Sequence, residues 1–220
     1  MLKVFIGRDP RKPLDANVLA NSIIDHASVP VSITMLSLKA LPMKRQGLTE
    51  FTFSRFLVPY LCGYQGLGLF LDADMVVTGD IAELFAVSKF GDAYQVYVNQ
   101  NQKPFEWASA MLFDCSLCSI LTPEFIDNPK NALLDFKWCE AGGIGKMPEE
   151  WNHCVPYAGT NENAKLYHFT QGTPNWKETR GKLEDKHWND AYKSMIHSCS
   201  FKELMGDSVH VAQMKAVNAD

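Results

Sequence analysis

The stretch from Gly68 to Val77 places the tightest limits on how this chain can fold. Its apolar residues lead directly into Asp72 and Asp74, which are one residue apart, and apolar residues resume after this pair. A short, continuously apolar segment is typical of a strand buried on both faces, such as a strand in the middle of a parallel sheet. The stretch therefore predicts an α/β fold with this strand at its centre.

The two aspartates of this stretch point to a ligand site. Side chains two positions apart in extended chain face the same way, so Asp72 and Asp74 are expected to project together where the strand ends. Ligands of open α/β sheets bind beyond the carboxyl ends of the strands. Adjacent carboxylates repel each other unless a cation lies between them, and hard oxygen ligands suit magnesium or manganese. The alternative is turn chemistry, because Asp is common where a strand enters a turn.

The size and charge of the chain exclude several classes of protein. With 220 residues, 46% of them hydrophobic, it can bury one sizeable core as a single α/β domain. The net charge is −4 without a basic run, so no nucleic-acid partner is expected. No apolar stretch approaches the roughly 20 residues of a membrane span. The segment from Met1 to Gly7 is too short for a signal peptide and predicts a first strand, so we expect a cytoplasmic protein.

The six cysteines predict no metal site of their own. Cys115 and Cys118 have CxxC spacing, but no second pair lies at the distance of a zinc ribbon. His153 and Cys154 are too isolated to complete a tetrahedral site. Buried, reduced thiols are therefore expected.

Secondary-structure patterns along the chain support a parallel sheet. A strand at Leu2–Ile6, a helix at Asp15–His26 and a strand at Val29–Leu38 form a βαβ unit, which implies a right-handed crossover. Residues Phe51–Leu61 have helical periodicity, which the charged Arg55 interrupts. Arg55 is either a snorkelling surface cation or a residue whose guanidinium points at the aspartates or at a diphosphate.

The other predicted elements are a helix capped near Asp80 with Glu83 in a capping box, strands at Ala93–Val98, Trp107–Cys115 and Lys165–Phe169, and peripheral helices from Glu178 onward.

Several segments occur in an order and spacing that together are more specific than any one of them. They are Val4–Asp9, Ser54–Phe56 ahead of Leu71–Asp74, Gly79–Ile81, Met147–Asn152 and His168–Gly172. In these segments the chain resembles the family 8 glycosyltransferases, the glycogenin- and galactosyltransferase-like group with a GT-A fold. The resemblance extends from residue 4 to about residue 176.

The resemblance implies one GT-A domain over residues 1–220, a Rossmann-like fold with a mostly parallel central sheet flanked by helices. Its nucleotide and metal half would be 1–80, its donor and acceptor half 81–176, and 177–220 a peripheral helical tail. The implied activity is that of a retaining hexosyltransferase, which moves a sugar from a nucleoside diphosphate, commonly UDP, with manganese or magnesium. The acceptor would be a sugar, a lipid or a protein.

The same resemblance assigns roles to particular residues. Asp72, Asp74 and His168 would bind the metal, with Arg55 near the aspartates and the sugar as a further catalytic residue. The loop Gly7-Arg8-Asp9 would hold the nucleoside, with Asp9 accepting a hydrogen bond from the base. Departure of a nucleoside diphosphate builds charge on the β-phosphate, which a divalent cation neutralises. An imidazole beside two carboxylates favours manganese over a purely hard magnesium shell.

The chain departs from the family pattern at three places. The family's diphosphate lysine is absent from the segment His168–Trp176, so Lys177 or backbone N–H groups near Gly172 would have to replace it. The family's Asn-Ser-Gly strand is replaced around Trp107-Ala108-Ser109, so the identity of the sugar is not implied. Glu140 is the nearest candidate for the family's acidic residue at the acceptor, and it is equally interpretable as a solvated loop carboxylate.

Two other functions remain open from the sequence. The segment Phe70–Val76 also resembles the first motif of haloacid-dehalogenase-type phosphatases, in which Asp72 would be the nucleophile and Asp74 the acid/base. That motif usually opens a chain, whereas here two predicted strands precede it. The missing lysine suggests the second alternative, a non-catalytic domain that binds nucleotide sugars.

Overall fold

The βαβ opening is present as predicted. In this computed structural model, which describes residues 1–88 and 92–196, β1 (Leu2–Gly7) pairs in parallel with β2 (Val31–Leu36). Helix α1 (Pro13–His26) makes the crossover between them. Strand β3 (Leu67–Leu71) lies on the other side of β1, also in parallel, with Ile6 opposite Leu71. The carboxyl ends of β1 and β3 therefore meet at one edge of the sheet.

The central sheet is mostly parallel, which confirms the predicted fold class. Its six strands have the order β2-β1-β3-β6-β5-β7. Strand β6 (Ala110–Asp114) runs antiparallel to both β3 and β5 (Val96–Val98), whereas β7 (Ile144–Lys146) is parallel to β5. A second sheet has the order β4-β9-β8, and its strands are β4 (Met75–Val77), β9 (Leu166–Phe169) and β8 (His153–Val155).

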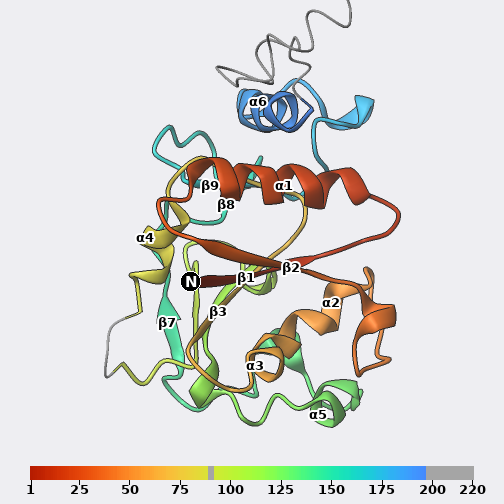
Figure 1. Ribbon diagram of the computed structural model, residues 1–220, viewed down its shortest axis with the longest axis vertical. Coiled ribbons are helices and arrows are strands. Elements are labelled where there is room, and N and C mark those ends of the chain that lie inside the picture. The colour runs from red at the N-terminus through yellow and green to blue at the C-terminus, as the bar shows by residue number, and fades with distance from the viewer. Residues whose placement is uncertain (89–91, 197–220) are drawn as a thin grey trace, which may run out of the picture.

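Helices cover both faces of the central sheet. In Figure 1, α1 crosses one face, while α2 (Phe51–Ser54), α3 (Val58–Leu61) and α5 (Pro123–Asp127) lie on the other. Helix α4 (Ile81–Phe85) follows β4, and α6 (Asp185–Met195) lies over α1 on the side away from the sheet. In α6, Trp188 packs in one cluster with Val18 of α1 and Phe169 of β9.

The predicted central strand is buried on both faces, but it ends before the aspartates. Phe70 packs in the core on the α2 and α3 side, Leu69 and Leu71 pack in the core beneath α1, and all three are 0% exposed. The apolar residues after the aspartates do not extend this strand, because Met75–Val77 form β4 in the second sheet. The chain bends at Asp72–Asp74 and passes from one sheet to the other.

Three other predicted elements need correction. The predicted helix Phe51–Leu61 is broken into α2, a 3₁₀ turn at Arg55–Leu57 and α3, because Pro59 lacks the N–H that a continuous helix requires. The strand predicted at Trp107–Cys115 begins only at Ala110, after a 3₁₀ segment at Pro104–Ser109. Asp80 caps α4 as predicted, but Glu83 forms an ion pair with Lys165.

The cysteines of the described residues are free thiols, as predicted. No helix in the described ranges is long and apolar enough to cross a membrane. Cys62, Cys115, Cys118 and Cys154 are buried free thiols, and Cys139 is a half-buried one. Cys199 and the predicted tail beyond residue 196 lie outside the described residues.

Ser22 connects α1 to the second sheet, and we expect its loss to destabilise the fold. Ser22 is 0% exposed, and its Oγ accepts a hydrogen bond from the Val77 backbone N–H at 3.0 Å. Ser22→Ala leaves that N–H buried and unpaired, so the free energy of unfolding should fall by about 1–3 kcal/mol. Urea denaturation measures the change, with Ser32→Ala on β2 as a control that should have little effect. Equal stability of the two variants would contradict the prediction.

Candidate active site

The pairing of β4 with β9 brings the three predicted metal ligands together. Asp72 and Asp74 lie in the connection from β3 to β4, and Met75 of β4 is opposite His168 of β9. His168 Nε2 is therefore 3.4 Å from Asp74 Oδ1. Ligand atoms of Asp72, Asp74 and His168 all lie within 4.8 Å of one another. That spacing allows a single cation to contact all three side chains.

The donor set of this cluster suits a divalent cation. Asp72 Oδ1 is buried and accepts no hydrogen bond from any described residue, although Arg55 Nη2 lies 3.1 Å away as an ion-pair partner. Asp74 is more accessible, with 31% of its side chain exposed. Two carboxylates with one imidazole match the ligands of manganese and related ions. The residues present thus fit the metal that the sequence predicts.

Within the cluster, Asp74 and protonated His168 form a charged pair, and a bound cation would take the place of the His168 proton. Burial raises the pKa of Asp72 to about 7, against the lowering effect of Arg55. Burial also opposes charge on Asp74, but the His168 imidazolium holds the pKa of Asp74 below its usual value. Burial likewise disfavours the imidazolium, yet Asp74 raises the pKa of His168 well above its usual value. A cation that displaces the His168 proton would keep both carboxylates compensated.

Arg55 is a buried cation directed at Asp72. Its Nη1 donates to the Ala108 carbonyl at 2.6 Å and its Nε to the Phe51 carbonyl at 3.3 Å. The guanidinium carbon lies 5.0 Å from the centre of the Phe70 ring, and only 8% of the residue is exposed. The snorkelling interpretation is therefore wrong, and the structure places the guanidinium toward the aspartates.

Glu106 is a carboxylate at this site that the sequence reasoning missed. It is 6% exposed, and its Oε2 lies 3.7 Å from His168 Nδ1. Burial raises the pKa of its carboxyl. A clue was present in the sequence, since a charged residue stands between Phe105 and Trp107 just ahead of an apolar strand. Glu140, the predicted acidic candidate, is exposed before β7 and does not line the pocket that contains Glu106.

The predicted nucleoside loop lies at the carboxyl end of β1, but its contacts are with protein. A Cβ on Gly7 would lie 2.6 Å from ring carbons of Phe51, so this glycine permits a close approach. Asp9 is 4% exposed, and its carboxylate accepts from the Arg11 backbone N at 2.9 Å and from Arg11 Nη2 at 2.6 Å. Arg8 is half-buried and donates its N–H to Leu36. Arg11 thus engages both oxygens of the Asp9 carboxylate.

The predicted diphosphate loop follows β9 and is attached to α1. Gly172 has a φ of +111°, and the Thr173 hydroxyl donates to Asp15 at 2.9 Å. Burial raises the pKa of Asp15 to about 6. Lys177 is exposed, whereas Lys12 places its ammonium 5.8 Å from the centre of the Trp176 ring. Lys12 was not predicted, and it supplies a second cation beside this loop.

A cavity of about 350 Å³ opens onto the cluster. Arg55, Glu106 and Ser109 line it together with the three predicted metal ligands. Leu48 and Phe105, which also line it, are 90% and 64% exposed and lie at its mouth. The cavity therefore combines charged groups at its base with apolar side chains at its entrance.

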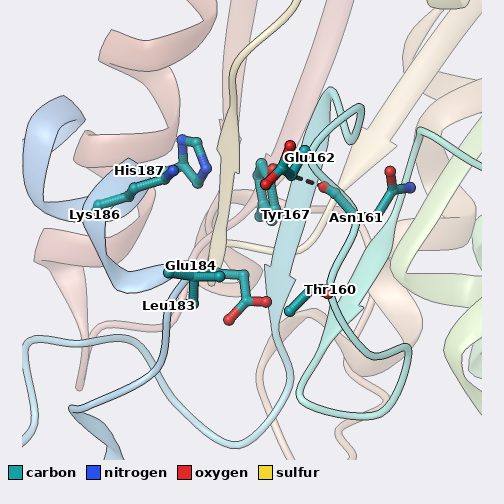
Figure 2. Close-up of a pocket in the computed structure, with 8 residues that line it drawn as sticks. All are labelled: Thr160, Asn161, Glu162, Tyr167, Leu183, Glu184, Lys186 and His187. Atoms are coloured by element: carbon teal, nitrogen blue, oxygen red, sulfur yellow. Dashed lines mark hydrogen bonds between the residues drawn. The ribbon is translucent and has the colours of Figure 1, made fainter.

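A separate pocket of about 290 Å³ lies between α6 and the loop before β9. In Figure 2, Tyr167 projects from β9 and its hydroxyl donates to the Asn161 carbonyl at 3.0 Å. Tyr167 also stacks on His187, with ring centres 4.4 Å apart. None of the predicted site residues lines this pocket. The predicted residues Arg55, Asp72, Asp74 and His168 line the cavity at the aspartates instead.

Comparison with solved structures identifies the architecture as the GT-A glycosyltransferase fold. The chain matches the glycosyltransferase GlyE of Streptococcus pneumoniae TIGR4 with a TM-score of 0.66 and 15% identity, over 89% of this chain and 63% of GlyE. It matches the galactosyltransferase LgtC, in complex with donor and acceptor sugar analogues, with a TM-score of 0.60 and 10% identity, over 92% of this chain and 99% of LgtC. The bifunctional glycosyltransferase WbbM gives a TM-score of 0.63 at 14% identity, over 93% of this chain, which spans about half (51%) of WbbM. The predicted GT-A fold is confirmed, and membership of family 8 stays a prediction.

The sequence itself is 31% identical to Protein CDI of Arabidopsis thaliana, over 92% of this chain and 83% of that protein. The chain belongs to the family of Protein CDI. No protein-family model matches it.

Proposed function

We propose that this chain is a metal-dependent, retaining glycosyltransferase of the hexosyltransferase type. It would take a sugar from a nucleoside diphosphate, UDP first among the candidates, and transfer it to a sugar, lipid or protein acceptor. The observation that carries the proposal is the convergence of Asp72, Asp74 and His168 within 4.8 Å in a cavity of a GT-A fold. The nucleotide half, 1–80, provides the aspartates, and the half 81–176 provides the histidine.

Each residue of the cavity has a distinct part in this proposal. Asp72, Asp74 and His168 would hold a manganese or magnesium ion, which neutralises charge that develops on the departing diphosphate. Arg55 would orient Asp72 through its ion pair at 3.1 Å, and its charge favours the carboxylate form that burial opposes. Lys12, beside the Gly172 loop, is a candidate for the countercharge that the family's missing lysine would supply.

The GT-A fold favours this function over a haloacid-dehalogenase-type phosphatase. Asp72, the nucleophile in that alternative, has only 14% of its side chain exposed and is paired with Arg55. A non-catalytic nucleotide-sugar-binding domain would use the same cavity, and an assay for transfer or hydrolysis distinguishes it from an enzyme.

A thermal-shift screen of nucleoside diphosphate sugars, with manganese or with a chelator, tests the proposal. We expect at least one UDP-sugar to raise the melting temperature only when manganese is present. At a ligand concentration of 100 times Kd the stabilisation is about 2.7 kcal/mol, or roughly 5–10 °C for a chain of this size. Manganese alone and UDP alone are the controls. A panel without any metal-dependent shift would refute the proposed function.

A further inference from the structure

One segment singled out in the sequence, Met147–Asn152, has no part in the function described so far. It leads into β8, the neighbour of β9 in the second sheet. Its last residue, Asn152, is 0% exposed and has a φ of +65°, a left-handed conformation that Asn adopts more readily than most residues. A buried amide in such a conformation must have its polar atoms paired, because leaving them unpaired would destabilise the fold. The hydrogen-bond partners of Asn152 therefore indicate its structural role.

The hydrogen bonds of Asn152 determine which way its amide faces. Its Nδ2 donates to Ser109 Oγ at 3.0 Å and to the Glu106 carbonyl at 3.3 Å. The Ser109 hydroxyl itself donates to the Glu106 carbonyl, so it can only accept from Asn152. A carbonyl oxygen also only accepts. Both partners thus require the NH₂ group on this side, and Oδ1 is left facing His168.

The oriented Oδ1 in turn determines which nitrogen of His168 carries a proton. Asn152 Oδ1 lies 3.1 Å from His168 Nδ1, and an amide oxygen cannot donate. Nδ1 must therefore carry the hydrogen, which leaves Nε2, the nitrogen 3.4 Å from Asp74, to face the metal position. Glu106 Oε2 and Cys154 Sγ are farther from Nδ1, at 3.7 and 3.8 Å. Asn152 is thus the nearest hydrogen-bond partner of Nδ1 among the described residues.

The hydrogen bonds of Asn152 and Ser109 also reach Asp72, another of the proposed metal ligands. The Ser109 carbonyl accepts from the Asp72 backbone N–H at 2.8 Å, while its hydroxyl accepts from Asn152. Ser109 and Asn152 therefore link the backbone of Asp72 to the imidazole of His168. Such outer partners of a metal ligand set its tautomer and ring orientation, and their loss weakens metal binding by about 10–100-fold.

We propose that Asn152 is a positioning residue that holds His168 as the Nδ1–H tautomer, with Nε2 directed at the cation. The inference rests on the proposed metal site and adds to it a residue outside the ligand set. Asn152 acts through His168 and Ser109 and contacts neither the cation nor the substrate.

Manganese titrations, with and without UDP and followed by electron paramagnetic resonance of the free ion, test this role. Asn152→Gly keeps the left-handed backbone but removes the amide, and we expect it to weaken manganese binding by about 10–100-fold. Asn152→Asp keeps an oxygen acceptor for Nδ1 and should bind manganese within a few-fold of the natural chain. This rescue distinguishes positioning from loss of structure.

Asn99→Ala is the matched control. Asn99 is also 0% exposed and donates to the Trp151 carbonyl, so it supports the same segment, and no hydrogen bond between it and His168 is seen in the described residues. This variant should lower the melting temperature but keep the manganese affinity. An Asn152→Gly variant that binds manganese as well as Asn99→Ala would overturn the positioning role and leave the proposed function standing. Failure of the natural chain to bind manganese, alone or with UDP, would overturn the metal site and the inference together.

Discussion

Replacing Asp74 or His168 with alanine is expected to abolish manganese-dependent UDP binding while the fold stays intact. Asp74 has 31% of its side chain exposed at the cavity, so its truncation opens no cavity in the core. Each variant removes one of only three protein ligands, and we expect a loss in metal affinity above the roughly hundredfold upper limit for an outer partner. Calorimetric titration of UDP with manganese measures the effect.

The control for these variants is Asp135→Ala. This carboxylate is 60% exposed on the surface and is paired with Lys137, so its removal should leave UDP binding unchanged. Circular dichroism and melting temperatures without metal establish that each variant is folded. If Asp74→Ala and His168→Ala both keep the manganese-dependent affinity of the natural chain, the proposed metal site is wrong.

Arg55→Met is expected to produce the largest loss of stability among single substitutions at the site. It removes the cation 3.1 Å from Asp72 and leaves a carboxylate with only 14% of its side chain exposed. It also leaves the Ala108 carbonyl without the hydrogen bond that Arg55 Nη1 donates to it in the natural chain. Removal of one member of a buried ion pair lowers the free energy of unfolding by about 3–5 kcal/mol. Urea denaturation without added metal measures the loss.

A double variant shows whether the loss comes from the charge. In Arg55→Met with Asp72→Asn, no unpaired carboxylate remains, so part of the stability should return. A non-additive result of this kind identifies the ion pair as the source. A loss below about 1 kcal/mol in Arg55→Met would instead mean that water or another group already compensates Asp72.

The predicted site residues differ in how far the structure supports them. Asp72, Asp74, His168 and Arg55 converge, as spacing and resemblance led us to expect. Asp9 is engaged by Arg11 and Lys177 is exposed beyond Trp176, and their roles toward a nucleotide stay predictions. Arg11 and Asp9 are two positions apart, but their ion pair depends on side-chain directions that only the structure reveals.

Glu106 and Asn152 show why part of the site could not be predicted. Each lies in irregular backbone, a 3₁₀ segment and a left-handed position, where no periodicity reveals which way a side chain faces. Their importance comes from contact with His168, which follows later in the chain on β9. Only the pairing of strands from distant segments establishes such contacts.

The sequence by itself determined the βαβ opening, the doubly buried strand and the presence of two carboxylates at its end. These features follow from local periodicity and from the match between apolar residues and burial. The tertiary structure alone decided that Gly68–Val77 divides between two sheets, because Met75–Val77 pair with β9 in the second sheet and do not continue β3. That division bends the chain at Asp72–Asp74 and places His168 beside them. The cluster of Asp72, Asp74 and His168 therefore forms because two sheets meet there, and the sequence pattern of one strand cannot encode the meeting of two sheets.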